Sequence, residues 1–317
     1  MHHGQEVYIF FYSYGINGMI GITISSIIIG ITIYKTFKIV EKNEIKNYKE
    51  FLDYFMKNEK VKELINSIIN IFILVSFYIM IAGFGAYLEQ EINLNSFIGS
   101  AILAVMCCIL LKTNINGIVK INEILIPILI IVVLTDFLNI SDYLIPQKNE
   151  TLFENWLITS VLYASYNCVL LIPVLISIKE LIVKSKNIKY ISIMVSIILI
   201  ILLSIVFLFL INVDVDIKKL QMPAVYAISN IWPGIKRLYG IIILISIFTT
   251  AISLGIGFLK NVAIGKKGFD TVDFLMCASA IIFSGIGFSN LVNLLYPILG
   301  VFGLVQIIQI CCRKTDK

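Results

Sequence analysis

The sequence predicts an all-α, polytopic membrane protein, and its composition and the spacing of its apolar runs support that prediction. Of the 317 residues, 59% are hydrophobic and only 14% are charged, whereas a soluble domain carries about a quarter charged residues. Apolar runs of about 20 residues, the length that spans a bilayer as a helix, follow one another with short polar loops between them. The mean hydropathy of +0.95 agrees. We therefore expect a multi-pass protein in contact with the lipid bilayer.

The expected spans cover most of the chain. A half-length apolar run comes first, at 4–14. Full spans follow at 16–35, 64–88, 93–111, 117–138, 157–178, 188–211, 235–259, 272–289 and 291–311. The segment 36–63 mixes both signs of charge with aromatic residues at helical spacing, which predicts an amphipathic cytoplasmic helix on the membrane. The N-terminus has no basic region and no small-residue cleavage site, so no cleaved signal peptide is expected.

The Lys and Arg residues indicate the orientation, because they collect in short cytoplasmic loops. The chain has 25 Lys and Arg residues. If 36–63 lies inside, those expected outside are Lys148, Lys218, Lys219, Lys236 and Arg237. This asymmetry predicts a multi-pass protein of the cell membrane with a cytoplasmic C-terminus. The formal net charge of +5 then reflects topology, and no nucleic-acid partner is expected.

A polar stretch interrupts the span 157–178 near its middle and includes Tyr163, Ser165, Tyr166 and Asn167. Two structures fit this pattern. In one, the helix is broken, and the freed backbone groups and these side chains bind a solute, as at the broken helices of secondary transporters. In the other, the helix is intact and its polar residues face neighbouring helices.

Gly4, Gln5 and Glu6 open the half-length run 4–14, ahead of its apolar residues, so they predict a second interruption at membrane depth. A carboxylate inside a membrane is a candidate for function, and no Lys or Arg lies close to Glu6 in the sequence. We expect these residues to join the solute site. The alternative is that Gln5 and Glu6 lie at the membrane interface.

Ser246, Thr249, Thr250 and Ser253 share one face of the helix expected at 235–259. Four hydroxyl groups on one stripe supply the oxygen ligands that Na+ requires, which predicts an ion site. Alternatively, these hydroxyls bond to carbonyls of their own helix.

The six cysteines have no spacing typical of a metal site and are expected to be small apolar fillers: Cys107, Cys108, Cys168, Cys277, Cys311 and Cys312. The two histidines, His2 and His3, are adjacent at the N-terminus. No nucleophile and base are paired in the sequence, so an enzyme is not expected. No cofactor is expected beyond Na+ or H+ as a coupling ion, with no metal other than Na+.

The spacing of the spans indicates an internal repeat. The spans expected from 64 and from 235 are separated by nearly the same length of chain as those expected from 117 and from 291. This predicts one transmembrane domain, 1–317, made of repeat one (1–138) and repeat two (157–311), each opening with a broken helix. Five spans is an odd number, so the second repeat enters from the opposite side, as in inverted-repeat transporters.

These residues resemble a known family. Five short motifs are similar to the YkvI-like bacterial membrane proteins. They are Gly4-Gln5-Glu6, Phe10-Phe11 with Gly15, Asn122 with Pro127, 163–167, and Thr249-Thr250-Ala251. That family is similar to the amino acid-polyamine-organocation superfamily, which implies the five-plus-five inverted-repeat fold of sodium symporters. By this resemblance, Ser246, Thr249 and Thr250 match a sodium site. A glycine-rich stretch and a half-helix precede Gly4 in the family, so we expect the first half-helix to be lacking here.

The leading functional expectation is a cation-coupled secondary transporter of a small amino-acid-like or amine solute, working by alternating access. One alternative is a nutrient-sensing membrane subunit similar to spore-germination permeases. Another is a truncated membrane protein that does not transport. The sequence carries no signal for the oligomeric state.

Overall fold

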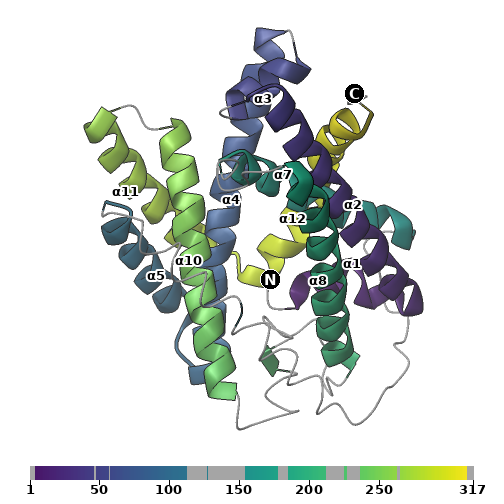
Figure 1. Cartoon of the computed structure of the whole chain (residues 1–317). Helices are drawn as coiled ribbons and strands as arrows, with labels where there is room; N and C mark the ends of the chain where they lie inside the picture. Colours follow the sequence, from purple (N-terminus) through teal and green to yellow (C-terminus); the bar gives the residue numbers. More distant parts are fainter. Residues whose placement is uncertain are drawn as a thin grey trace. The chain divides into compact units, whose positions relative to one another are not determined.

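Helices make up all the secondary structure in the part of the chain that the computed structural model describes, which is residues 4–45, 48–56, 58–112, 127, 154–177, 185–211, 225–226, 236–262 and 265–312. In chain order (Figure 1) they are α1 (Gln5–Phe10), the 3-10 turn η1 (Tyr12–Tyr14), α2 (Ile16–Lys42), α3 (Tyr48–Phe55), α4 (Glu59–Ile92), α5 (Ser96–Leu110), α7 (Trp156–Ser177), α8 (Ser185–Ile211), α10 (Lys236–Val262), α11 (Gly265–Ser284) and α12 (Phe288–Cys312). The all-α class is confirmed for these ranges.

Six helices in the described ranges are long and apolar enough to cross a membrane, namely α2, α4, α7, α8, α10 and α12. They confirm a multi-pass protein that contacts the lipid bilayer. The span expected at 117–138 lies outside the described residues apart from Pro127.

The expected spans 16–35 and 64–88 lie within the longer helices α2 and α4, and two other expected spans are shortened or shifted in the structure. Helix α5 covers most of 93–111 but has only 15 residues, so it is shorter than a full span. Helix α11 begins at Gly265, before the expected 272, and takes in the charged residues Lys266, Lys267, Asp270 and Asp273. It ends at Ser284 instead of 289, because a turn follows there in which Gly287 has a φ of 89°, a conformation that favours glycine.

The half-length run at 4–14 forms the six-residue α1 followed by the turn η1, so it does not continue into α2. Gly15 separates the two with a φ of 61°. Position 18 also requires glycine, because a Cβ there would lie only 2.6 Å from the carbonyl carbon of Phe11. The chain therefore turns tightly between α1 and the first long helix.

The break expected at 163–167 is not present, and that prediction is wrong. Helix α7 runs without interruption from Trp156 to Ser177. The Ser165 hydroxyl donates to the Val161 carbonyl at 2.7 Å, and the Asn167 amide donates to the Tyr163 carbonyl at 2.9 Å. Because these polar groups bond one turn back along their own helix, α7 accommodates them without unwinding.

The chain divides into two compact units, each assembled from segments distant in the sequence. Unit 1 comprises Met1–Tyr8, Asn70–Ile145 and Ile205–Asn293. Within it, α5 packs along α11 (Figure 1), and α10 contacts both helices. Gly85 of α4 allows a close approach to α5, since a Cβ there would lie 3.0 Å from the backbone nitrogen of Ser100.

Unit 2 comprises Ile9–Ile69, Pro146–Ser204 and Leu294–Lys317. Its main packing is between α2 and α7, where Gly21 faces Ser160 and the ring of Phe11. The amphipathic helix expected in 36–63 corresponds to α3. Its apolar residues Phe51 and Leu52 are buried in the protein, so this face packs against protein.

Candidate functional site

A cluster of buried aromatic rings lies in unit 2, and it includes two of the expected solute-binding residues, Tyr163 and Tyr166. Phe10 lies 5.6 Å from each tyrosine, measured between ring centroids, and Phe11 lies 4.7 Å from Tyr163. Tyr166 also stacks on Tyr296 of α12, with a centroid distance of 4.6 Å and an interplanar angle of 23°. The structure thus brings the end of α1, the middle of α7 and α12 together around Tyr166.

Two glycines of α12 let it approach α7 at this level. A Cβ on Gly300 would lie 2.8 Å from the Leu162 carbonyl oxygen. A Cβ on Gly303 would lie 2.6 Å from the Ser165 carbonyl carbon and 2.7 Å from Cγ2 of Val169. Small residues of this kind permit close contact between helices in membranes. The backbone of α7 on both sides of Tyr163 therefore lies directly against α12.

The four polar positions expected on α7 have different surroundings. Tyr163, Ser165 and Tyr166 are buried, and Asn167 is partly exposed. The side chains of Ser165 and Asn167 bond to carbonyls of α7 itself. Only the two tyrosines of this set therefore join the aromatic cluster described above.

The expected residues at the start of the chain lie in unit 1. Gly4 has a φ of 85°, and its carbonyl accepts a hydrogen bond of 2.9 Å from the Tyr8 amide, which begins α1. The side chain of Gln5 lies outside the described residues. Glu6 lies in the first turn of α1 with only 4% of its surface exposed. A carboxylate in the first turn is favoured by the helix dipole. Its burial is the feature expected of a functional carboxylate.

In the hydroxyl stripe of α10, two side chains bond to carbonyls of their own helix, which is the alternative to an ion site. Thr249 donates to the Ser246 carbonyl at 3.2 Å, and Ser253 donates to the Thr249 carbonyl at 2.8 Å. Thr249 is buried, Ser246 is partly exposed, and Thr250 and Ser253 are exposed. Thr249 and Ser253 thus satisfy their hydroxyls on their own helix, and the sodium site stays a prediction.

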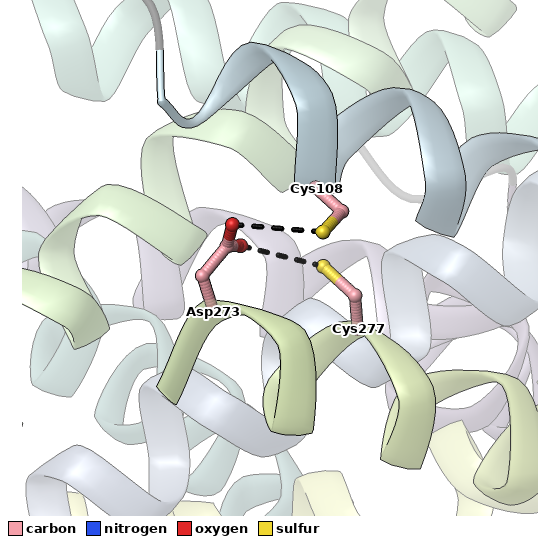
Figure 2. A group of neighbouring side chains, drawn as sticks. All are labelled: Cys108, Asp273 and Cys277. Atoms are coloured by element: carbon pink, nitrogen blue, oxygen red, sulfur yellow. Dashed lines mark hydrogen bonds between the residues drawn. The ribbon is translucent and has the colours of Figure 1, made fainter. Parts of the chain in front are cut away.

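A cluster that the sequence reasoning missed lies in unit 1. Cys108 of α5 meets Asp273 and Cys277 of α11 (Figure 2), and both thiols donate to the Asp273 carboxylate at 3.6 Å. The cysteines were interpreted as apolar fillers, which does not describe these two. The available signal was Asp273 and Cys277 four residues apart on one helix face, but Cys108 is distant in the sequence and comes close only through the packing of α5 on α11.

Comparison with known proteins supports the membrane assignment. The chain is similar to the "Uncharacterized membrane protein YkvI" of Bacillus subtilis (strain 168), with 26% identity over 332 residues that cover 99% of this chain and 91% of the relative. No family model matches the chain. The chain is a membrane protein homologous to YkvI, and the expected resemblance is confirmed at that level.

Proposed function

We propose that the protein is a cation-coupled secondary transporter of a small amino-acid-like or amine solute that works by alternating access. The observation that carries the proposal is the buried aromatic cluster around Tyr166, in which the short helix α1 ends against the middle of the span α7. Secondary transporters hold their solutes beside interrupted helices, and the short helix α1, separated from α2 by the turn η1, is the interrupted element here.

The order of the helices supports the inverted repeat in this proposal. Helices α2 and α8 begin at Ile16 and Ser185, and helices α5 and α11 begin at Ser96 and Gly265. The two members of each pair are therefore separated by the same length of chain. Both members of the second pair belong to unit 1, and most of both helices of the first pair belongs to unit 2. Units that each draw on both halves of the chain suit the repeat architecture of secondary transporters.

The chemistry of the cluster favours a solute with a cationic group. Tyrosine faces attract an ammonium group through their ring quadrupoles, and Phe10 and Phe11 supply apolar contact. Glu6, buried in α1, is proposed separately as a carboxylate for a cationic group or for a coupling proton. Thr249 and Thr250, with Ser246 and Ser253, are the proposed Na+ ligands. The rings are packed together in this structure, so solute entry requires Tyr166 to separate from Tyr296.

Ligand-induced thermal stabilisation of the purified full-length protein tests the proposal. Amino acids and primary amines should raise the melting temperature in Na+ buffer more than in choline buffer. Tyr166→Leu should remove the solute effect, and Thr249→Ala with Thr250→Ala should remove the Na+ effect. Thr32→Ala is the matched control, because Thr32 is also buried and also donates to its own helix, at 2.9 Å to the Ile28 carbonyl.

An equal loss of the Na+ effect in Thr32→Ala and in the double variant would contradict the sodium assignment. If Na+ and choline give the same melting temperature in the wild type, the coupling ion is H+ or there is none, and Glu6→Gln then decides between these through the pH dependence of solute binding. Solute binding without flux would favour the nutrient-sensing alternative.

A further inference from the structure

The strongest unassigned feature in the described part of the chain is the group formed by Cys108, Asp273 and Cys277. One thiol sulfur, one carboxylate oxygen and a second thiol sulfur lie within 4.8 Å of one another. They come from two helices of the same unit that pack side by side. Figure 2 shows both thiols directed at the two oxygens of Asp273.

With both cysteines protonated, the cluster compensates the buried negative charge of Asp273 poorly. The carboxylate is fully buried, with no exposed surface, and burial of a charged group is costly unless strong partners replace water. Thiols are weak hydrogen-bond donors. The two hydrogen bonds that the structure shows for this carboxylate both come from thiols. A cation held between the three groups would compensate the carboxylate far better.

We propose that Cys108, Asp273 and Cys277 form a binding site for a soft divalent cation, Zn2+. Zinc takes thiolate sulfur at about 2.3 Å and carboxylate oxygen at about 2.1 Å. In tetrahedral geometry those lengths place sulfur and oxygen about 3.6 Å apart. In the cluster, Cys108 lies 3.6 Å from one carboxylate oxygen of Asp273 and Cys277 lies 3.6 Å from the other. The three ligand atoms lie within 4.8 Å of one another, so small side-chain rotations bring them to an ion placed between them.

Binding exchanges protons for the metal. Zn2+ binds thiolate, so each thiol loses its proton to solvent as the ion enters. The two thiolates and the carboxylate carry one negative charge more than the ion neutralises. Lys112, which interacts electrostatically with both Asp273 and Cys108, offsets that charge, while Asp270 adds to it.

The site has three protein ligands and an open side. Asp273 and Cys277 are buried, whereas Cys108 is partly exposed, so the ion enters past Cys108 and its fourth position is taken by water. Because Cys108 lies on α5 and the other two ligands lie on α11, the bound ion joins these helices. Zinc is therefore a clamp within unit 1, independent of the proposed solute site.

Calorimetric titration of Zn2+ into the reduced, chelator-treated, untagged full-length protein tests the proposal. His2→Ala with His3→Ala serves as the background, so that the N-terminal histidines do not contribute. We expect one Zn2+ per chain and a higher melting temperature with Zn2+ or Cd2+, but no such effect of Mg2+ or Ca2+. Asp273→Asn and Cys277→Ser should each weaken binding at least about tenfold.

Cys168→Ser is the matched control, because Cys168 is a fully buried thiol outside the cluster, and it should keep wild-type affinity. Absence of Zn2+ binding overturns the proposal. So does binding that survives Cys277→Ser but is lost when Cys311 and Cys312 are both replaced by alanine.

A second measurement uses the unsubstituted cluster, so it holds if the variants fail to fold. Zn2+ should protect the partly exposed Cys108 from a maleimide reagent, with labelling located by peptide mass spectrometry, and Mg2+ should not. Equal labelling of Cys108 with and without Zn2+ overturns the proposal.

Discussion

Gly303→Ala tests the packing that positions the aromatic cluster. The added Cβ would lie 2.6 Å from the Ser165 carbonyl carbon and 2.7 Å from Cγ2 of Val169. Ordinary carbon–carbon contacts lie at about 3.5–4.0 Å, so α12 must move away from α7 by about 1 Å. A rigid backbone carbonyl cannot move aside as a flexible side chain can. Overpacking of this kind costs about 1–3 kcal/mol, and we expect the free energy of unfolding to fall by that amount.

Gly257→Ala is the control, since a Cβ at that position of α10 meets no atom within 4 Å. Alanine is favoured over glycine inside a helix by about 1 kcal/mol, so this variant should be neutral or stabilised. Denaturant titration in mixed micelles measures both variants. If Gly303→Ala is as stable as Gly257→Ala, α7 and α12 do not pack as the structure has them.

Three further changes test other contacts in unit 2. Tyr166→Leu removes the stacked pair with Tyr296, 4.6 Å between centroids, and should lower the free energy of unfolding by about 1–3 kcal/mol; an unchanged value would contradict the ring packing. Lys35 donates to the Cys311 carbonyl in the last turn of α12, so Lys35→Met should cost about 1–2 kcal/mol and speed amide exchange in that turn; unchanged exchange would refute the bond. Burial raises the pKa of Tyr48, so above pH about 10 the unfolded state ionises first and stability falls; this fall should be smaller in Tyr48→Phe, and identical pH profiles would contradict it.

The helical class follows from the sequence, and six of the nine expected full spans correspond to long apolar helices in the described ranges, because apolar length is the dominant constraint on a chain in a bilayer. Helix ends were less predictable. Helix α11 takes in Asp273, which the sequence placed at the edge of a span, because hydropathy does not show that a charged residue can be buried against another helix.

The polar residues of α7 show why local pattern does not decide between a break and a helix. Ser165 and Asn167 have the composition of an unwound segment, but each bonds one turn back, at 2.7 and 2.9 Å. Whether a side chain bonds to its own helix or leaves the backbone free depends on neighbours such as Gly303, which the sequence does not place. The tyrosines of the same stretch, expected as solute-binding residues, are buried against rings of α1 and α12, and these partners could not be found from the local pattern.

The cluster of Cys108, Asp273 and Cys277 could not be predicted from the spacing of residues in the sequence. Asp273 and Cys277 lie one turn apart and could be paired by inspection, but Cys108 is brought to them by tertiary packing. A metal site assembled across two helices has no local motif.

The central claim, solute transport coupled to a cation, is tested most directly by recording currents from proteoliposomes adsorbed on a solid-supported membrane. The full-length protein is challenged with amino acids and primary amines, in Na+ or choline and at acid and neutral pH. We expect a solute-dependent current that requires Na+ or a proton gradient and that is lost in Tyr166→Leu. It should be kept in Tyr190→Leu, because Tyr190 is 70% exposed. A folded, reconstituted protein that gives no solute-dependent current under any of these conditions would contradict the account.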